Sequence, residues 1–547
     1  MRALAEQFGA ALLVAALAPP LVVLAIFLAP GSRGLARAIT PLAAAPALAA
    51  AALAIGGAPF GTELPALRMS LMLDRPSGIL LAAAALVWMV VSAFALGEGK
   101  GTPNADRFAV SWLLTMVGSL GVFIAADLLI FYLVYALVSI PAYYLVAYDE
   151  DADTKRAGGV YLVFALLGEA ILLIAFVMVA AGEPSGSLLI RDVVAALPAS
   201  PWRDAALALL IIGFGMKIAL VPLHGWMPLT YTAAPIPAAA VLSGAAVKAG
   251  VIGLIRFLPL GAAFPGWGEA FVWLGFISAF TGVAIGVTQP NPKTMLAYSS
   301  ISQMGVIAAA LGMALATASK AGPVDAAFYA ANHVLVKAGL FLTVGVVAAL
   351  GGRARTLALV LAALLALNLG GLPLTGGALA KISVKDLFGD GAAGWAAQAS
   401  APASTALMLL FLIRLAGAPQ AEREVASFGR VWTWLALALA SLVVPWVMFP
   451  AVGRPAEALA LDKLWDAVWP MLIGAVLAVG LWAARDRLPR LPMGDIVVAE
   501  EAAFHGFAPL GAAFERADRD VRQWPVAGLA LLMVALALAA AAGYASR

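Results

Sequence analysis

The sequence of 547 residues contains no cysteine and only three histidines, and only 12% of its residues are charged. The absence of cysteine excludes disulfide bonds, cysteine-held iron–sulfur clusters and covalently attached haem. No phosphate-binding P-loop is present, since the most similar string, "GEGKGT", lacks the leading glycine spacing and the Ser or Thr after the lysine. We therefore expect no metal site and no cofactor, and no electron transfer or ATP hydrolysis within this chain.

Apolar residues are abundant where charged residues are few. They make up 63% of the chain, and the mean hydropathy is +0.99. Apolar runs of about 18 residues or more recur along the chain, and each can cross about 30 Å of hydrocarbon. Because the runs do not alternate like barrel strands, the predicted fold is an all-α polytopic membrane protein. About 16 segments qualify, centred near residues 19, 46, 87, 116, 137, 169, 213, 245, 279, 305, 337, 370, 406, 440, 474 and 534.

Some segments are interpreted differently. The N-terminal apolar run continues to Leu28, which is longer than the apolar region of a signal peptide, so we interpret it as the first span. The stretch 65–76 is too short and polar to span. Residues 187–197 and part of the solvated linker 498–524 are predicted to form interfacial amphipathic helices. The loop distribution of lysine and arginine predicts that both termini lie on the external side of a bacterial inner (cell) membrane.

Six basic residues fall outside every predicted loop, namely Lys217, Lys248, Arg256, Lys337, Lys381 and Lys385. Arg256 and Lys385 can extend to the membrane interface. The other four lie near the middle of apolar segments, where a lysine facing lipid costs at least about 2.5–3.5 kcal/mol. They must therefore face the protein interior. A row of buried lysines linked by water is a proton relay, and the alternative is that each lysine is a tether between two helices.

Two of the segments that carry these lysines are predicted to be broken helices. Pro222 and Pro228 follow Lys217, and Pro373 with four neighbouring glycines precedes Lys381. An interior proline removes a backbone hydrogen bond, and the freed carbonyls are tolerated only where they line a cavity or meet other protein groups. Interrupted segments in corresponding halves of a chain are typical of inverted-repeat transporters.

Four motifs in order resemble one family. They are "KIALVPLHGWMPLTYTAAPIPAAAVLSGAAVKAGVIGLIRF" (217–257), "NPKTMLAYSSISQMG" (291–305), "NHVLVKAGLFLTVG" (332–345) and "GLPLTGGALAK" (371–381). They resemble the antiporter-like subunits of respiratory complex I, Mrp-type sodium/proton antiporters and membrane-bound hydrogenases. The resemblance covers roughly residues 70–415.

The resemblance implies a domain layout. Residues 1–105 hold helices one to three, 106–257 the first inverted repeat (helices four to eight) and 269–415 the second (helices nine to thirteen). Residues 428–547 hold the C-terminal helices with a polar linker at 485–524. The resemblance also implies that Lys217, Lys248, Lys337 and Lys381 form the proton relay. The supporting polar residues would be His224, His333, Asp127 and Lys385.

The sequence departs from the family pattern at the helix-five glutamate, which is Ala136 here, and at two further polar positions, which are Leu229 and Gln303. Glu169 lies in the middle of the next apolar segment and is too costly to face lipid. We therefore predict that Glu169 faces Lys217, directly or through one water, and replaces the lost acid. The alternative is that Glu169 is protonated and bonds a nearby backbone or hydroxyl group.

The sequence thus predicts a proton-translocating subunit of a multi-subunit membrane complex, either Mrp-type or complex I-like. Two alternatives remain, a non-conducting scaffold and the membrane subunit of a proton-driven inorganic carbon uptake system. The expected partners are other membrane subunits, the lipid bilayer and protons, with sodium as a second candidate ion and no nucleic acid. Whether the complex is an NADH:quinone oxidoreductase or a hydrogenase stays open, because this chain holds no redox site.

Overall fold

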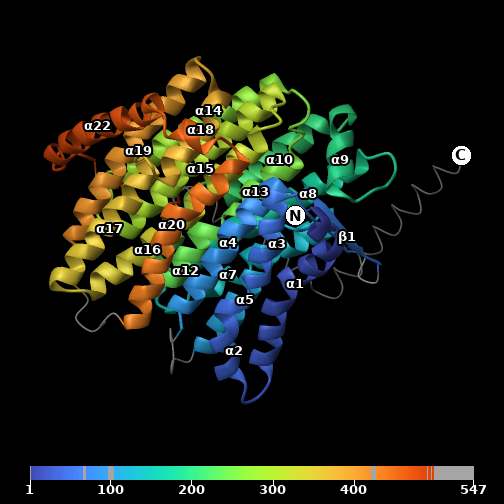
Figure 1. Ribbon diagram of the computed structural model, residues 1–547, viewed down its shortest axis with the longest axis horizontal. Coiled ribbons are helices and arrows are strands. Elements are labelled where there is room, and N and C mark those ends of the chain that lie inside the picture. Colours follow the sequence, from blue (N-terminus) through green and yellow to red (C-terminus); the bar gives the residue numbers. More distant parts are fainter. Residues whose placement is uncertain are drawn as a thin grey trace, which may run out of the picture. The chain divides into compact units, whose positions relative to one another are not determined.

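A computed structural model describes residues 2–65, 69–96, 104–420, 427–489, 491–494 and 496–497, with side chains from residue 8 onward. The chain divides into Met1–Met493 and Gly494–Arg547, and nearly all described residues belong to the first unit. The predicted linker 498–524 and the predicted span near residue 534 lie outside the described residues. The described part is a set of helices with one β-hairpin (Figure 1).

The longer helices of the first unit are α1 (Arg2–Leu28), α3 (Ala45–Gly56), α4 (Arg75–Phe94), α5 (Ala105–Gly121), α6 (Leu128–Ser139), α8 (Ala152–Ala181), α10 (Arg203–Lys217), α13 (Lys248–Phe257), α14 (Pro265–Gly286), α15 (Pro292–Thr317), α16 (Gly322–Ala349), α17 (Gly352–Gly370), α18 (Gly376–Phe388), α19 (Ala392–Ala416), α20 (Phe428–Met448) and α22 (Leu461–Ala483). The shorter ones are α2 (Arg33–Ile39), α7 (Ala142–Val146), α9 (Ile190–Ala196), α11 (Trp226–Ala233), α12 (Ile236–Val241) and α21 (Pro455–Ala458).

The prediction of an all-α polytopic membrane protein is confirmed. Among the described residues, 13 helical segments are long and apolar enough to cross a membrane. Helices α5 and α10 coincide with two further predicted segments, but they have only 17 and 15 residues. The predicted number of about 16 spans is therefore not established.

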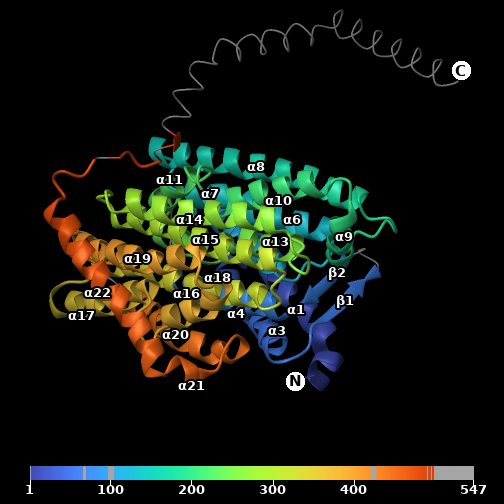
Figure 2. The same ribbon diagram turned by 90° about the horizontal axis from the view of Figure 1, so that it is seen from above.

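The buried centre of the unit is formed mainly by the middle of the sequence. The segment Ile236–Phe257 lies entirely inside the protein, and α15 and α16 are also mostly buried. By contrast, α1 and α22 expose most of their apolar side chains, as expected for helices that face lipid. Figure 2 shows α15 between α14 and α16, with which it packs. The lysines predicted from the sequence are carried by, or lie beside, these central helices.

Helices α14 and α15 pack with their backbones in direct contact. A methyl group added to Gly275 would lie 2.5 Å from the carbonyl oxygen of Gly305 and 2.6 Å from the amide nitrogen of Ala309. Gly282 faces Tyr298 of α15 in the same way, with 2.7 Å to its carbonyl oxygen. Small residues at such positions let membrane helices approach closely and gain dispersion energy along their length.

A short β-hairpin occupies the segment that was predicted not to span. Strands β1 (Phe60–Leu64) and β2 (Met69–Leu73) pair antiparallel, with Phe60 opposite Leu73. Asp127 fixes the hairpin to α6, because its carboxylate accepts hydrogen bonds from the backbone N–H groups of Ser70 and Ile130, each at 2.8 Å. The Ile130 bond is an N-terminal cap of α6.

Arg256 binds this same region, and its predicted extension to the membrane interface stays a prediction. Its guanidinium donates to the carbonyl oxygens of Ala125, Phe123 (2.6 Å) and Met72 (3.2 Å) and to the Ser77 hydroxyl (3.0 Å). A planar guanidinium with five donors can satisfy several carbonyls at once. Arg256 therefore joins α13 to the hairpin and to the loop that follows α5.

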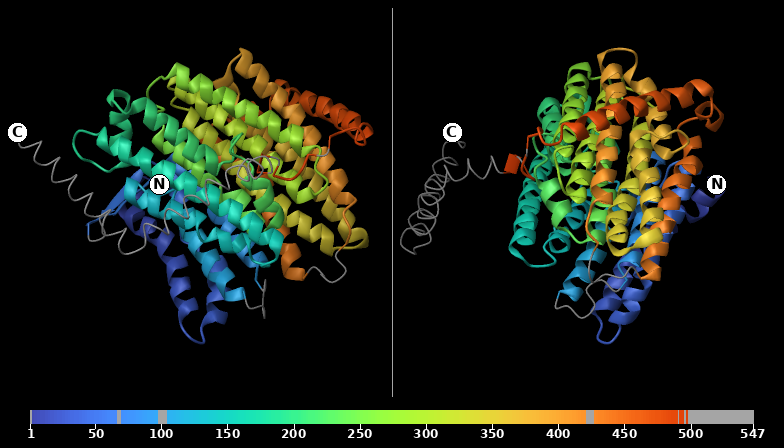
Figure 3. Two further views of the ribbon diagram at one scale, coloured as in Figure 1. Left: turned by 180° about the vertical axis from the view of Figure 1, so that it is seen from behind. Right: turned by 90° about the vertical axis from the view of Figure 1, so that its left-hand side faces the viewer.

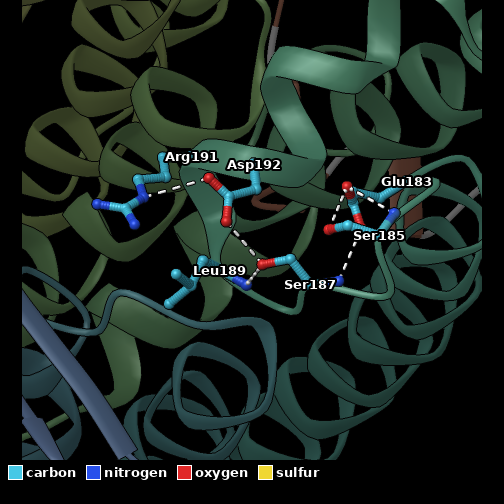
Figure 4. Close-up of polar contacts among 6 residues, drawn as sticks. All are labelled: Glu183, Ser185, Ser187, Leu189, Arg191 and Asp192. Atoms are coloured by element: carbon cyan, nitrogen blue, oxygen red, sulfur yellow. Dashed lines mark hydrogen bonds and ion pairs between the residues drawn. The ribbon is translucent and has the colours of Figure 1, made fainter.

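The segment predicted as a short amphipathic helix forms α9, and a polar loop precedes it (Figure 4). The Glu183 carboxylate accepts hydrogen bonds from the hydroxyl of Ser185 (2.8 Å) and the backbone N–H of Ser187 (2.7 Å). The Ser187 hydroxyl donates in turn to Asp192 at 2.7 Å. The helix is confirmed, and its position at a membrane interface stays a prediction.

Both predicted helix breaks are present. Helix α10 ends at Lys217 and α11 begins at Trp226, with Pro222 between them. Helix α17 ends at Gly370 and α18 begins at Gly376, with Pro373 between them. Pro228 was also predicted to break a helix, and this is wrong. It is the third residue of α11, where an amide hydrogen would have no partner within the helix.

Candidate functional site

The first break places Lys217 in a pocket of polar and aromatic side chains. The lysine is the last residue of α10, is 8% exposed, and donates a hydrogen bond to the Ser139 hydroxyl of α6 at 2.8 Å. Its ammonium also lies 5.4 Å from the ring centre of Tyr135 and 5.8 Å from that of Tyr161. Aromatic faces at this distance stabilise a buried cation. The pocket can therefore hold a charged lysine without a direct ion pair.

Glu169 of α8 belongs to the same pocket. Its carboxyl group is buried, interacts electrostatically with Lys217 and lies beside the Ser139 hydroxyl. Its Oε1 atom has no hydrogen-bond partner among the described residues. A cavity of about 10 Å³ adjoins Lys217, close to the space of one water molecule. It is lined by Tyr135, Ser139, Tyr161, Gly168, Lys217 and Trp226 among others. A one-water link between Glu169 and Lys217 stays a prediction.

Sequence reasoning missed Ser139 and the two tyrosines of this pocket. Ser139 lies three residues after Ala136, so it occupies the same face of α6 one turn further on. The available signal was a hydroxyl inside the apolar string "FYLVYALVSIP". Ser139 is therefore a polar residue one turn from the position of the missing glutamate.

Lys248 lies at a local distortion of its helix. Residues Leu242–Ala246 form a π-turn, and Lys248 opens α13 one residue further on, after Val247. Such turns leave carbonyls without their usual partners and are frequent at functional sites. The fully buried Lys248 ammonium donates to the Ser243 carbonyl at 3.1 Å, and its nitrogen lies 2.6 Å from Nδ1 of His333. The lysine and the histidine thus form a direct pair between α13 and α16.

Helices α10 and α13 touch between the two lysines. A Cβ atom added to Gly250 would lie 3.1 Å from Cβ of Lys217 and 2.9 Å from the Phe214 carbonyl oxygen. Gly250 is two residues from Lys248, so the close approach brings the two lysine-bearing segments side by side. Whether water joins their ammonium groups stays a prediction.

After Asp325 in its first turn, helix α16 carries three more titratable side chains at the same four-residue spacing, Tyr329, His333 and Lys337. Residues four apart lie on one face of a helix, so the three side chains form a line along α16. Lys337 is fully buried and donates to the Leu296 carbonyl of α15 at 2.8 Å. His333 occupies the middle of the line, where Nε2 has no partner among the described residues. The sequence predicts only a supporting role for His333.

The second break places Lys381 at a large cavity. The ammonium donates to the carbonyl of Gly370, at the end of α17. Gly371 has a φ of 96°, a left-handed conformation that favours glycine, and a Cβ atom there would lie 2.8 Å from the Lys381 nitrogen. Lys381 lines a cavity of about 340 Å³ together with Tyr329, Lys385, Asp386, Gln398, Ser400, Lys463 and Asp466 among others.

Gln303 occupies the position at which the family resemblance implied a histidine. Its side-chain oxygen accepts a hydrogen bond from the Tyr329 hydroxyl at 2.9 Å, and its amide donates to the Ser404 hydroxyl at 3.1 Å. The amide holds no exchangeable charge at neutral pH. Its structural effect is to orient Tyr329, which lines the cavity of Lys381.

The three other predicted supporting residues make contacts of their own. Asp127 is used in capping α6 and fixing the hairpin, as described above. His224 is buried in the first break, with its ring centre 6.4 Å from that of Tyr298. Lys385 is half exposed and forms an ion pair with Asp466 of α22 at 2.6 Å.

The helices, the two breaks and the buried titratable line define a multi-pass membrane protein whose ionisable groups face its own interior. Residues 125–408, slightly more than half of the chain, match the family described as NADH:quinone oxidoreductase/Mrp antiporter, transmembrane. The chain belongs to this family. The resemblance drawn from the four sequence motifs is thereby confirmed.

Curated relatives match the chain over part of their length. The chain is 30% identical over 296 residues to hydrogenase-4 component B of Escherichia coli (strain K12), which covers 51% of this chain and 43% of that protein. Another relative, subunit N of F(420)H(2) dehydrogenase from Methanosarcina mazei, is 30% identical over 271 residues, with 48% of this chain and 54% of that protein covered. The chain thus spans about half the length of the curated relatives it matches.

A solved structure shares the fold over nearly the whole chain. A chain of the Mrp complex from Dietzia sp. superposes with a TM-score of 0.74 at 22% identity, covering 98% of this chain and 63% of that chain. At this identity the likeness concerns the fold alone. It extends beyond the family match to the helices at both ends of the described sequence.

Proposed function

We propose that this protein moves protons across the membrane along its buried line of titratable groups. The path comprises the pocket of Lys217 and Glu169, the pair of Lys248 and His333, then Lys337, and finally Lys381 in its cavity. Each of these groups can hold or release a proton as its neighbours change charge. The four lysines lie on four different helical segments, so the path runs across the protein from one break to the other.

The observation that carries the proposal is the contact of 2.6 Å between Lys248 and His333. Both side chains are fully buried, and they come from different helices. Two cations cannot be held at this distance in a low-dielectric interior, so the pair shares one proton or none. An amine and an imidazole in direct contact can pass that proton between them. A tether between two helices would be served better by a lysine and a carboxylate.

The rest of the geometry supplies the two ends of the path. At one end, Ser139 and the aromatic rings hold Lys217 beside the buried carboxyl of Glu169. At the other end, Lys381 lines a cavity that also contains half-exposed charged side chains. The two breaks thus flank the central pair, in the arrangement expected for two inverted repeats around 106–257 and 269–415.

We also propose that the protein is a subunit of a larger membrane complex of the Mrp or complex I kind. Its curated relatives include a hydrogenase component and a dehydrogenase subunit, and the fold recurs in an Mrp complex. The driving reaction then belongs to other subunits. The bacterial cell membrane and an external position of the termini follow from the same proposal and from the loop charges.

The test replaces Lys248 by methionine, which keeps the length of the side chain and removes the titratable nitrogen. The intact complex is isolated through a tag on this chain, reconstituted in liposomes, and assayed with an internal pH-sensitive dye under an imposed potassium diffusion potential. We expect proton flux to fall about tenfold or more, as for loss of a proton-transfer group. Lys320→Met, which changes an exposed lysine, is the matched control and should keep full flux.

The alternative is a scaffold that holds partner subunits without conducting, and Ala136 in place of an acid favours it. A scaffold predicts that Lys248→Met leaves flux through the complex unchanged while assembly is normal. Size-exclusion chromatography of the tagged complex separates loss of flux from loss of assembly.

A further inference from the structure

The cavity of Lys381 is closed on one side by α22, which lies outside the region that matches the family. Lys463, Asp466, Ala467, Trp469 and Pro470 of this helix line the cavity together with residues of α18 and α19. Lys381 and Lys385 are one turn apart on α18. Lys385 and Asp466 have side chains 48% and 41% exposed, so they lie where the cavity meets the surroundings of the protein.

The ion pair of Lys385 and Asp466 is the polar link between α18 and α22 at this mouth, with 2.6 Å between Nζ and Oδ2. Half-exposed ion pairs contribute little to stability, because water competes for both charges. The pair can therefore open without loss of the fold. It is also sensitive to Lys381, since a proton on that lysine places a like charge one turn from Lys385.

The two halves of α22 are held differently. At Gly474 the helix touches α19, where an added Cβ atom would lie 2.5 Å from Cβ of Thr405 and 2.7 Å from the Pro402 carbonyl oxygen. Pro470 lies inside the helix one turn earlier and has no amide hydrogen for the preceding turn. The segment 461–469 is thus separated from the anchored half by a weakened turn. Figures 1 and 3 show α22, in red, crossing beside α19.

We propose that the segment 461–469 of α22 is a gate over the Lys381 cavity, held closed by the ion pair between Asp466 and Lys385. Asp466 is then a further positioning residue of the proton path, since it acts on Lys381 through access of water to the cavity. Opening requires only separation of the ion pair and bending at Pro470. The role of the gate rests on the proposed proton translocation, whereas the ion pair and the cavity are observed independently of that function.

The chain contains no cysteine, so a single introduced thiol can be labelled selectively within it. Ser400→Cys places a thiol of nearly the same size on the cavity wall, where the native side chain is 6% exposed. The rate of its modification by a charged, membrane-impermeant methanethiosulfonate is measured in the intact complex. We expect Asp466→Asn to raise this rate about tenfold or more, as for a shift of a closed population toward open. Asp466→Glu should restore a rate close to that of the parent.

The matched control is Asp462→Asn, which removes the same charge one turn earlier on the same helix. Asp462 is 71% exposed, and its ion-pair partner is the adjacent Lys463 of the same helix, 3.8 Å away. Its loss should therefore leave the labelling rate unchanged. Equal rates in Asp466→Asn and its parent overturn the gate. A rate that rises equally in Asp462→Asn overturns it too, because the effect would then be loss of surface charge.

A second measurement connects the gate to transport. Lys385→Cys and Asp466→Cys are combined, the two thiols are joined by mild oxidation, and proton flux is measured before and after reduction. We expect flux to fall on cross-linking and to return with a reductant, and unchanged flux in fully cross-linked protein overturns the role in transport. Thiol labelling does not depend on proton flux, so the two proposals can be tested separately. An unchanged labelling rate overturns the gate even if Lys248→Met abolishes transport. Likewise, unchanged flux in Lys248→Met overturns the proposed function even if the labelling rate rises.

Discussion

Lys217 is bound by Ser139, one helical turn from Ala136, the position at which the family pattern places an acid. The distance from the ammonium nitrogen to the hydroxyl oxygen is 2.8 Å. A hydroxyl can accept a hydrogen bond from a charged or a neutral lysine, and it can donate to a carboxylate at the same time. Ser139 is therefore suited to mediate between Lys217 and Glu169, which come from different helices. We propose that this hydroxyl and the Glu169 carboxyl together take the place of the lost acid.

Replacing Ser139 by alanine should impair proton flux. The variant Ser139→Thr keeps the hydroxyl and should have a flux close to that of the parent. Alanine leaves the Lys217 ammonium without its hydrogen-bond partner in a buried site, which costs on the order of 1–3 kcal/mol. The measurement is dye-detected flux in liposomes with the reconstituted complex. Equal flux in the alanine and threonine variants would show that Ser139 only fills space.

Glu169→Gln should strongly reduce proton flux, because the amide keeps the shape of the side chain and cannot carry a proton at neutral pH. Adding Ala136→Glu should partly restore flux by returning an acid to the helix that carries Ser139. The double variant is compared with Ala136→Glu alone in the same assay. Full flux in Glu169→Gln would support the alternative of a protonated carboxyl that only bonds its surroundings.

His333→Phe should abolish flux at least as strongly as Lys248→Met. Phenylalanine fills the volume of the ring and cannot accept the proton that Lys248 presents to Nδ1. We expect a loss of about tenfold or more, the range of a single proton-transfer group. His505, which lies outside the described residues, offers the control His505→Phe. Retained flux in His333→Phe would exclude the lysine–histidine pair from the path.

Arg256→Met should destabilise the protein and leave the proton path intact. The substitution removes the donors to the carbonyls of Phe123 and Met72 and to the Ser77 hydroxyl. Buried acceptors left unpaired cost about 1–3 kcal/mol each when no water reaches them. The thermal unfolding midpoint of detergent-solubilised protein should fall in Arg256→Met and fall less in Arg256→Lys. An unchanged midpoint would mean that water replaces the guanidinium.

Much of the fold followed from the sequence, because membrane helices are long apolar runs and a central lysine must turn inward. The same reasoning located both broken helices, since Pro222 and Pro373 stand beside lysines. Contacts between distant residues could not be predicted in this way. Lys248 and His333 are 85 residues apart, and only the packing of α13 on α16 brings them together.

Short segments were also beyond the reach of apolar periodicity. The strands β1 and β2 have five residues each, too few to give a pattern that differs from a loop. Likewise, nothing in the sequence near Arg256 indicates that its guanidinium binds the carbonyls of a distant loop. In both cases the missing information was tertiary, since the hairpin and the arginine stabilise one another.

The backbone contact between α14 and α15 limits where this protein can move. Gly275 and Gly305 leave no side-chain layer between the helices, so neither helix can slide or rotate past the other without steric overlap. Helices α14 and α15 therefore form a rigid unit. Any displacement that accompanies a working cycle has to occur in the segments around this unit, at the two interrupted helices and at α22.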